Sequence, residues 1–497
     1  MDHLKSSEER KARWYAKHIE PWYMPVKTID LNFIKNHYLT NNEAPSFRGE
    51  TEEVRGCNFC QQSYVPGIPG SLLHQNHHEV KQFLNDQIRE YGFVIIRHVL
   101  NIQQCNHAID LAWDYLEAAS SAEEYLHRRR NQDSIAQKNT NCPSRRRKER
   151  ASQLSKYHPK SVEGRIFPFY GAGHSSFQWY LRSQYYVQDV FALIHSVDRN
   201  ELITSLDGMI LWTEYDDDHM GKYRGTDDGN KPTTIAAYDH DKGWFHIDQN
   251  PKTKPKFASV QGLVNLLPVI ENTGGNVLVM GSHKMFPNHY LKSSKSSSDD
   301  VDVDVDVDEF YYERLKEING DDWLEIDPND TLLQKESTVM CLLGPGDMIV
   351  WDSRLIHCSY PGKPMPSSTN NEYEISMEEE VEGNELKRQG LVRAAGLVNM
   401  IPRSKCSIGV HSQRIQAIKN ARTLTHWVDK ASPLGEEQSK EVELEYQRVK
   451  YMRQNYQGES YWLDKKDEED MHSITPKRNK RVLLSLDDLT AEQRKLI

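Results

Sequence analysis

The sequence predicts a mainly β domain, a sandwich or barrel, with flanking α-helices. Between residues 244 and 403, short apolar runs alternate with turn residues, which is typical of many short strands in a layered or closed sheet. Before and after this region, apolar residues recur at helical spacing. The chain has 497 residues and is long enough to bury a core of this kind.

The N-terminal part contains an irregular segment and then helices. Residues 1–80 are rich in Pro, Asn and His, and we expect little regular structure there. Residues 78–92 have helical apolar spacing and end at a glycine; 93–99 form an apolar run typical of a strand; 101–126 are again helical in pattern. Residues 127–165 are basic and polar, so we expect a surface insertion.

The segment from 170 to 215 leads into the β region. Residues 183–197 are predicted to be a helix, and 203–215 a strand, a turn and a strand. Before them, the glycine-rich and aromatic stretch "YGAGHSSFQWYLRSQ" holds His174 and Trp179. These two residues either line a substrate entrance or belong to a buried helix start, and the second alternative is the default expectation.

The β region is interrupted twice and followed by helices. An insertion at about 290–330 includes a strict Val/Asp alternation, whose row of Asp would repel itself in a sheet, so we expect a disordered or edge loop. A second, at 361–390, is Pro-rich and then acidic. After residue 402 two amphipathic helices are expected, and the last thirty residues are expected to pack loosely. The predicted division is therefore 1–80, 81–430 and a helical, then flexible, 431–497.

The composition limits the classes of partner. The net charge of −11 disfavours nucleic acid as a general ligand; two basic clusters within 128–150 are expected to be solvated, with an anionic partner as the alternative. The seven cysteines are odd in number and scattered, which favours reduced thiols and a cytoplasmic location. The chain shows no secretory signal and no membrane-spanning apolar run, and we expect none.

The stretch "GWFHIDQNP" carries a candidate metal-binding pair. His246 and Asp248 stand two residues apart, so in a strand both side chains point to one face. One imidazole and one carboxylate are two members of the His, His, carboxylate set that holds Fe(II) and leaves positions open for a co-substrate and O₂. The third member must come from a neighbouring strand. His357 follows a Gly-Pro-Gly turn and an apolar strand and is preferred over His283, which more naturally lies in a turn.

A co-substrate such as 2-oxoglutarate also requires a cation for its distal carboxylate. Arginine suits this role because it is always charged and binds carboxylates with two parallel hydrogen bonds. Arg354 is an odd number of residues from His357 and is expected on the opposite face. Arg393 opens the next strand and is followed by small residues, which leave room for a ligand. Ser359 shares the face of His357 and can donate to the same carboxylate.

Four segments in order, "HID", "NTGGNVLVMGSHK", "PGDMIVWDSRLIHCS" and "VRAAGLVNM", resemble the phytanoyl-CoA dioxygenase-like family of Fe(II)/2-oxoglutarate-dependent oxygenases. The resemblance covers about residues 85–430. It implies a double-stranded β-helix (jelly roll, cupin-like) core, iron on His246, Asp248 and His357, and 2-oxoglutarate on Arg393 and Ser359. The chain departs from the family pattern in the long gap from His357 to Arg393, which brings in Lys387 and Arg388 as competitors, and in having Met280 where the family usually has proline.

These observations predict a cytoplasmic Fe(II)- and 2-oxoglutarate-dependent dioxygenase that hydroxylates an aliphatic carbon of a small-molecule substrate. Two alternatives stay open: a catalytically inactive jelly roll that acts as a binding module, and a metal-dependent enzyme, such as a Zn²⁺ hydrolase, that does not use 2-oxoglutarate. Nucleic-acid demethylation has only the basic clusters in its favour. The sequence identifies neither the substrate nor the oligomeric state, because fold does not fix function.

Overall fold

The computed structural model describes residues 24–28, 63–65, 67–73, 77–130, 159, 166–213, 245–269, 273–291, 305–317, 323–334, 337–360, 391–433, 439–455 and 481–497. Several features of the sequence lie outside these residues: Trp244, Lys387 and Arg388, most of the basic insertion at 127–165, and the whole insertion at 361–390.

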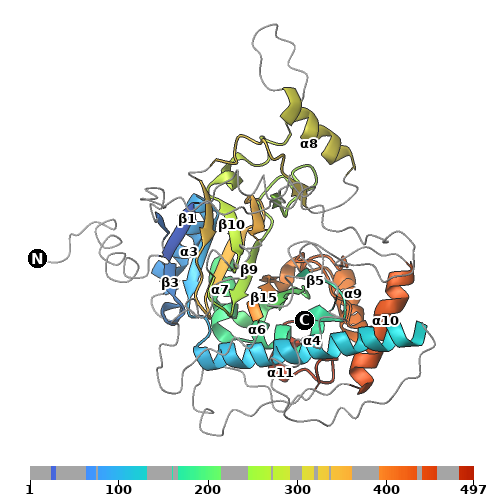
Figure 1. Cartoon of the computed structure of the whole chain (residues 1–497). Coiled ribbons are helices and arrows are strands. Elements are labelled where there is room, and N and C mark those ends of the chain that lie inside the picture. Colours follow the sequence, from blue (N-terminus) through green and yellow to red (C-terminus); the bar gives the residue numbers. More distant parts are fainter. Residues whose placement is uncertain are drawn as a thin grey trace, which may run out of the picture.

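The core consists of two seven-stranded sheets (Figure 1). The first sheet has, in spatial order, β11 (Leu324–Glu325), β8 (His246–Ile247), β14 (His357–Tyr360), β10 (Gly275–Val279), β12 (Thr338–Cys341), β1 (Met24–Thr28) and β2 (Ser63–Val65). The second has β3 (Gly67–Pro69), β4 (Phe93–Arg97), β13 (Met348–Asp352), β9 (Val260–Asn265), β15 (Leu391–Val398), β7 (Met209–Thr213) and β5 (Ile166–Phe167). Strands β3 and β4 pair in parallel, and the other pairs of these sheets are antiparallel.

Alternating side chains of the strands contribute to two apolar layers. One lies between the two sheets, and the other lies between the second sheet and the helices. In β13, Ile349 and Trp351 belong to a cluster shared with the first sheet, whereas Met348 and Val350 pack among the helices. In β10, Leu278 joins the same shared cluster. This period of two is what a strand buried on both faces requires. The side chains that point between the two sheets, such as Ile349, Trp351 and Leu278, therefore define one inner face.

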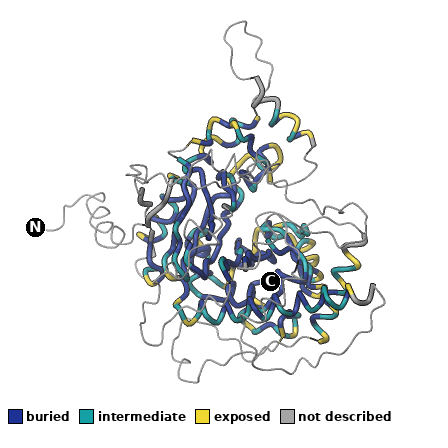
Figure 2. The backbone as a smooth tube through the Cα atoms, in the orientation of Figure 1, coloured by how far each residue is buried: buried dark blue, intermediate teal, exposed yellow. Residues whose placement is uncertain are grey.

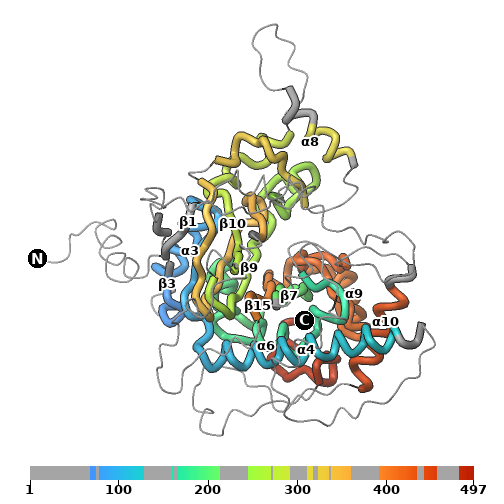
Figure 3. Tube along the Cα trace, viewed as in Figure 1, coloured from blue at the N-terminus to red at the C-terminus, as the bar shows by residue number. Residues whose placement is uncertain are grey.

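Helices cover the outer face of the second sheet and one end of the first, and the buried residues follow these layers (Figures 2 and 3). The second sheet is covered by α3 (His77–Tyr91), α4 (Ile102–Arg130), α6 (Ser176–Arg182) and α7 (Tyr185–His195). The first sheet is covered at one end by α8 (Val305–Glu317). Helix α10 (Ser439–Asn455) packs directly on α4, with the Tyr125 and Tyr451 rings stacked at 4.7 Å. Helix α9 (Ile408–Asn420) lies against α10, where Arg453 donates to the Ile418 and Lys419 carbonyls.

Local sequence signals account for several helix boundaries. Helix α6 begins after Ser175, whose side chain accepts a hydrogen bond from the Gln178 amide. Helix α9 begins after Ser407 in the same way, with the Val410 amide as donor. A serine in this position satisfies one of the amides that a helix start leaves unbonded. The stretch that holds His174 and Trp179 is a buried helix start, since both side chains are fully enclosed.

The expectation of a disordered or edge loop for the Val/Asp repeat is wrong at the C-terminal end of the repeat. Helix α8 begins at Val305, inside the repeat. The helix is held by residues that follow the repeat: Tyr311 and Leu315, four positions apart, are buried against the first sheet. Arg314 forms an ion pair with Glu325 of β11, at 2.7 Å between Nη2 and Oε2. Tertiary packing of one helical face thus overrides the local period of two.

The last residues of the chain also differ from the expectation of loose packing. Val482, Leu483 and Leu484 are buried in the same cluster as the helices over the second sheet. The Ser176 amide donates to the Val482 carbonyl at 2.9 Å, and the Leu484 amide donates to the His174 carbonyl at 2.9 Å. The charged composition of this region led to the expectation of loose packing, although it contains a short apolar segment that packs against the start of α6. In the described part of the chain, none of the helices is both long and apolar enough for a membrane crossing.

We expect the Leu483→Ala variant to unfold more easily than the parent protein, by about 2–5 kcal/mol, since it removes a buried side chain and leaves a cavity. Urea denaturation monitored by circular dichroism measures the difference. Asp487→Ala, an exposed position in the same segment, is the control and should change stability by less than about 0.5 kcal/mol. Equal stability of the two variants would mean that the Leu483 side chain does not contribute to the core.

Candidate metal centre

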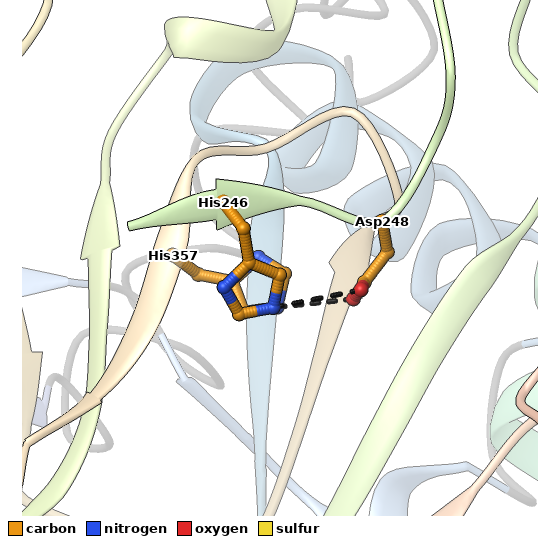
Figure 4. A group of neighbouring side chains, drawn as sticks. All are labelled: His246, Asp248 and His357. Carbon is orange, nitrogen blue, oxygen red and sulfur yellow. Dashed lines mark ion pairs between the residues drawn. The ribbon is translucent and has the colours of Figure 1, made fainter. Parts of the chain in front are cut away.

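Two adjacent strands of the first sheet bring His246, Asp248 and His357 together (Figure 4). His246 lies in β8, Asp248 follows directly after this strand, and His357 opens β14. In the antiparallel pairing of β14 with β8, His357 stands opposite His246. The local spacing of two residues and the cross-strand pairing therefore place all three side chains on the inner face.

The three side chains converge on one point. Each offers one ligand atom, and these atoms lie within 4.8 Å of one another. Nε2 of His357 is 3.0 Å from Oδ2 of Asp248, and Nε2 of His246 is 3.5 Å from Oδ1 of the same carboxylate. Two imidazole nitrogens and one carboxylate oxygen are the donor set of non-haem Fe(II) sites. The residues present therefore form a triad that fits a divalent metal.

Neighbouring groups orient two members of the triad. Nδ1 of His357 lies 2.9 Å from the carbonyl oxygen of Leu355. Because a carbonyl only accepts, Nδ1 carries the proton, and Nε2 is left with a lone pair for a metal. Nε2 of Gln261, from β9 of the second sheet, donates to Oδ2 of Asp248 at 2.7 Å. The Asp248 amide also donates to the Ser353 carbonyl at 2.9 Å. The triad is thus fixed from both sheets.

The electrostatics of the triad favour a bound cation. Burial alone raises the pKa of Asp248, but the adjacent His357 and His246 outweigh it, and the net pKa lies well below the ordinary value. Burial lowers the pKa of His357, whereas the charge and hydrogen bond of Asp248 raise it, with a net rise. Asp248 is therefore ionised, and in the metal-free protein a proton on His357 takes the place of a metal ion.

Arg393 presents a buried cation farther along the inner face. Its Nη1 donates to the Ser359 hydroxyl and its Nη2 to Oδ1 of Asn276, both at 2.8 Å, and the guanidinium lies over the Trp212 ring at 4.9 Å from the centroid. Only 2% of the residue is exposed, and Nε has no hydrogen-bond partner in the described structure. Burial lowers the pKa of Arg393 to about 10, so the group is charged at neutral pH.

No ion pair among the described residues includes Arg393. The carboxylate that such a buried cation needs is thus not supplied by the described chain. The pairing of β10 with β14 puts Asn276 opposite Ser359 and Leu278 opposite His357. Triad and arginine therefore lie on one continuous face, with Ser359 between them. A ligand that reaches from the metal position to Arg393 needs a carboxylate at its distal end.

The other candidates from the sequence lie elsewhere or are already paired. His283 lies in a 3-10 helix (Ser282–Met285), and its Nε2 is 3.1 Å from the Arg89 carbonyl. It is not part of the triad. Arg354 forms an ion pair with Asp352, at 2.6 Å between Nη2 and Oδ2. Arg393 is thus the cation that the structure places on the inner face beside Ser359.

Three further residues, which the sequence pattern did not reveal, contact the residues of the site. Asn276 and Gln261 are polar residues inside otherwise apolar strands, and this contrast was the available signal. Trp323, just before β11, carries no such signal. Its ring meets the His246 ring edge-on, with 6.4 Å between centroids, and 41% of the residue is exposed. An indole in this position adds an accessible apolar wall beside the triad.

Comparisons with known proteins give distant likenesses. No family model matches the chain. Ava biosynthesis cluster protein O from Aspergillus versicolor is 26% identical over 221 residues, 43% of this chain and 58% of that protein, so the chain spans less than two thirds of this curated relative. A solved structure of a hypothetical protein from Escherichia coli is similar over 86% of this chain and 84% of its own, with 12% identity and a TM-score of 0.42. EvdO2 from Micromonospora carbonacea var. aurantiaca, complexed with 2-oxoglutarate, is similar over 64% of this chain and 89% of its own, with 13% identity and a TM-score of 0.26. Structural neighbours thus include a 2-oxoglutarate-binding protein, but likenesses at this level assign no activity to this chain.

We expect the affinity of the triad for Co(II) to fall on acidification. A ligating imidazole must be neutral, and the pKa of His357 is raised above its ordinary value. The protonated form therefore competes with the metal up to a pH above the usual histidine value of about 6.5. Below that pH each displaced proton lowers the affinity about tenfold per pH unit. Calorimetric titration from about pH 6 to 8.5 covers this range. The His283→Ala variant should give the same pH profile as the parent protein, and a flat profile in the parent would contradict the assignment of the ligands.

Proposed function

We propose that the chain is an Fe(II)- and 2-oxoglutarate-dependent dioxygenase of the phytanoyl-CoA dioxygenase-like kind, hydroxylating an aliphatic carbon of a small organic substrate. The observation that carries the proposal is the buried guanidinium of Arg393, which lies on the same inner face as the triad and has no carboxylate partner in the described chain. A triad alone fits many metal enzymes. A triad together with a deep cation fits a metal-chelating dicarboxylate.

The roles of the residues follow from their positions. His246, Asp248 and His357 would hold Fe(II), whereas Arg393 and Ser359, joined by Asn276, would hold the distal carboxylate of 2-oxoglutarate. Ferrous iron with bound 2-oxoglutarate supplies the oxidising chemistry, consuming O₂ and releasing succinate and CO₂.

The chain itself contributes orientation and a dry environment. Arg393 is preorganised, because Ser359 and Asn276 each hold one terminal nitrogen and the Trp212 ring covers one face of the guanidinium. The inner face around it is apolar, with Trp351, Ile349 and Leu278 buried. A carboxylate that binds here exchanges water for a charged, two-pronged donor in a low-dielectric site, where such hydrogen bonds are strong.

The other functions explain fewer of these features. A Zn²⁺ hydrolase needs the triad but has no use for a buried arginine at the end of the inner face. A binding module that uses the outer surface needs neither, and burying Arg393 without a counter-ion would only destabilise it. Nucleic-acid demethylation has no further support, because most of the basic insertion lies outside the described residues.

We further propose that the two sheets form a double-stranded β-helix. The sequence indicates residues 81–430 as the oxygenase domain, but the expectation of little regular structure in 1–80 is wrong where β1, β2 and β3 lie: β1 pairs with β12 and β3 pairs with β4. We therefore propose that the domain includes these three strands. The described residues beyond 430 would then act as part of its cover. Helix α10 packs on α4, and Leu483 and Ile497 belong to the same apolar cluster as the helices of the second sheet.

The test is anaerobic titration of the protein with Fe(II) and 2-oxoglutarate. We expect a visible metal-to-ligand charge-transfer band, and succinate formation once O₂ is admitted. In the Arg393→Lys variant, the affinity for 2-oxoglutarate should fall at least about tenfold, equivalent to about 1.4 kcal/mol, since lysine cannot make two parallel hydrogen bonds from a planar group. Metal affinity should be unchanged, because Arg393 is not one of the metal ligands.

Arg453→Lys is the matched control, since Arg453 is a partly buried arginine on α10 that donates to backbone carbonyls. It should behave as the parent protein in both measurements. If the parent protein shows neither the band nor succinate, the proposal is wrong. Metal-dependent hydrolysis without 2-oxoglutarate would favour the hydrolase, and a function that survives His246→Ala would favour the binding module.

A further inference from the structure

Trp323 lies beside the triad, on the same face of the first sheet. In the pairing of β11 with β8, Glu325 stands opposite His246. Opposite residues of an antiparallel pair share a face, and so do residues two positions apart in a strand, so Trp323 is placed on the face of His246, level with Asp248. The ring contact agrees with this placement, because the indole is perpendicular to the His246 ring at 6.4 Å between centroids.

The strand order puts Trp323 and Arg393 on opposite sides of the triad. Along the first sheet the order is β11, β8, β14 and β10, and the triad is carried by β8 and β14. Arg393 is held by Ser359 of β14 and Asn276 of β10. A co-substrate that reaches from the metal to Arg393 therefore extends away from β11. A substrate that approaches the metal from the other side of the triad meets Trp323.

The site is accessible at β11 and closed around Arg393. Strand β11 is at the edge of its sheet, and 41% of Trp323 is exposed, against 2% of Arg393. Within the triad, the side chain of Asp248 is 14% exposed and that of each histidine 8%. The most accessible member of the triad is thus the one that lies level with Trp323. These differences place the accessible side of the triad beside the indole.

Helix α8, at one end of the first sheet, holds the segment that carries Trp323 (Figure 1). Arg314 forms its ion pair with Glu325, and the Tyr311 hydroxyl accepts a hydrogen bond from the Asp327 amide at 3.3 Å. The chain directly after Trp323 is therefore fixed at two points. A surface that is already held in place loses less conformational freedom when a ligand binds to it.

The exposed indole presents a flat, rigid and apolar surface. Ligand sites are lined mainly by apolar and aromatic side chains, with a few polar groups that fix orientation. A flat ring system that packs on an indole gains from the aromatic contact beyond the apolar area that it buries. It also has few rotatable bonds, so it loses less freedom on binding than an aliphatic chain does. Trp323 therefore favours a substrate with a flat ring system.

The charged groups around the triad balance in the proposed complex. The two positive charges of ferrous iron and the one of Arg393 offset those of Asp248 and of dianionic 2-oxoglutarate. Beside the indole, Glu325 is paired with Arg314. A charged substrate would leave water for a site whose described charges are already matched, at a cost in free energy. A neutral substrate avoids this cost.

We propose that Trp323 is the substrate-binding surface of the site and that the substrate is a neutral compound with a flat, apolar ring system, which packs against the indole. This inference rests on the proposed oxygenase function and names the substrate class of that same site. The substrate and the co-substrate then reach the metal from opposite sides of the triad.

The experiment uses the full chain loaded anaerobically with Fe(II) and 2-oxoglutarate, and it follows the shift of the charge-transfer band as a probe is added. The probe is 2-naphthalenemethanol, which is neutral and flat. Decahydro-2-naphthalenemethanol tests the flat shape, and 2-naphthalenesulfonate and 2-naphthylmethylamine test the charge. We expect the neutral flat probe to shift the band and to bind about threefold to tenfold more tightly than its saturated counterpart, the range of one aromatic contact. It should also bind more tightly than either charged compound.

Two variants of Trp323 separate the ring from the apolar volume. Trp323→Leu should reduce the preference for the flat over the saturated compound to near one, since leucine is apolar but has no ring, and Trp323→Phe should retain part of it. The matched control is Tyr446→Ala, which removes an exposed aromatic side chain of α10 and should leave the ratio unchanged. The band recorded before a probe is added shows that each variant still binds Fe(II) and 2-oxoglutarate.

The inference is overturned if the neutral flat probe does not shift the band at millimolar concentration, if the saturated or charged compounds bind as tightly, or if the preference survives in Trp323→Leu. Absence of the band in the parent protein, before any probe is added, would instead overturn the oxygenase function, and this inference with it. The two failures are therefore distinguishable.

Discussion

The site depends on one constraint, the position of β14 between β8 and β10. Pairing with β8 puts His357 opposite His246, and pairing with β10 puts Ser359 opposite Asn276. One strand therefore aligns the triad with the residues that hold Arg393. A slip of one residue would turn Cys358 inward and both His357 and Ser359 outward, because side chains alternate between faces. The apolar residues on the outer face, including Cys358 in the cluster under α8, fix this register.

The same inner face concentrates charge where burial makes charge costly. Asp248 and Arg393 both lie on the inner face between the sheets, where an isolated charge is strongly unfavourable. Each is held by a neutral side chain: Gln261 donates to Asp248, and Asn276 accepts from Arg393. These neutral partners fix the orientation of each charged side chain but do not neutralise its charge. The free energy gained by the large apolar cluster over the second sheet offsets the cost of burying these charges.

The sequence alone predicted those parts of the fold and site that local patterns encode. Alternation identified the strands, and the spacing of His246 and Asp248 gave a pair on one face. Arg393 was proposed from its strand and from the small residues after it, although 36 residues separate it from His357, and the structure places its guanidinium beside the Ser359 hydroxyl. Its function, like that of Ser359, is still a proposal. The pairing register of strands that are distant in sequence cannot be inferred from local patterns. Asn276, which binds Arg393, and Gln261, which binds Asp248, were therefore missed. Trp323 was missed for the same reason, since β11 is only two residues long.

Residues of the site differ in how strongly the fold restricts them: some lie inside buried strands, and others lie just outside strand ends. Arg393, Ser359 and Asn276 lie inside regular, buried strands, where substitutions disturb packing and register. Trp323 lies just outside the end of a strand, on a segment that another element positions: α8 holds β11 through Arg314 and Glu325. A change in α8 can thus move Trp323 and leave the triad and Arg393 in place. Substrate choice would then depend on a helix outside the sheets, although this helix contributes none of the metal ligands.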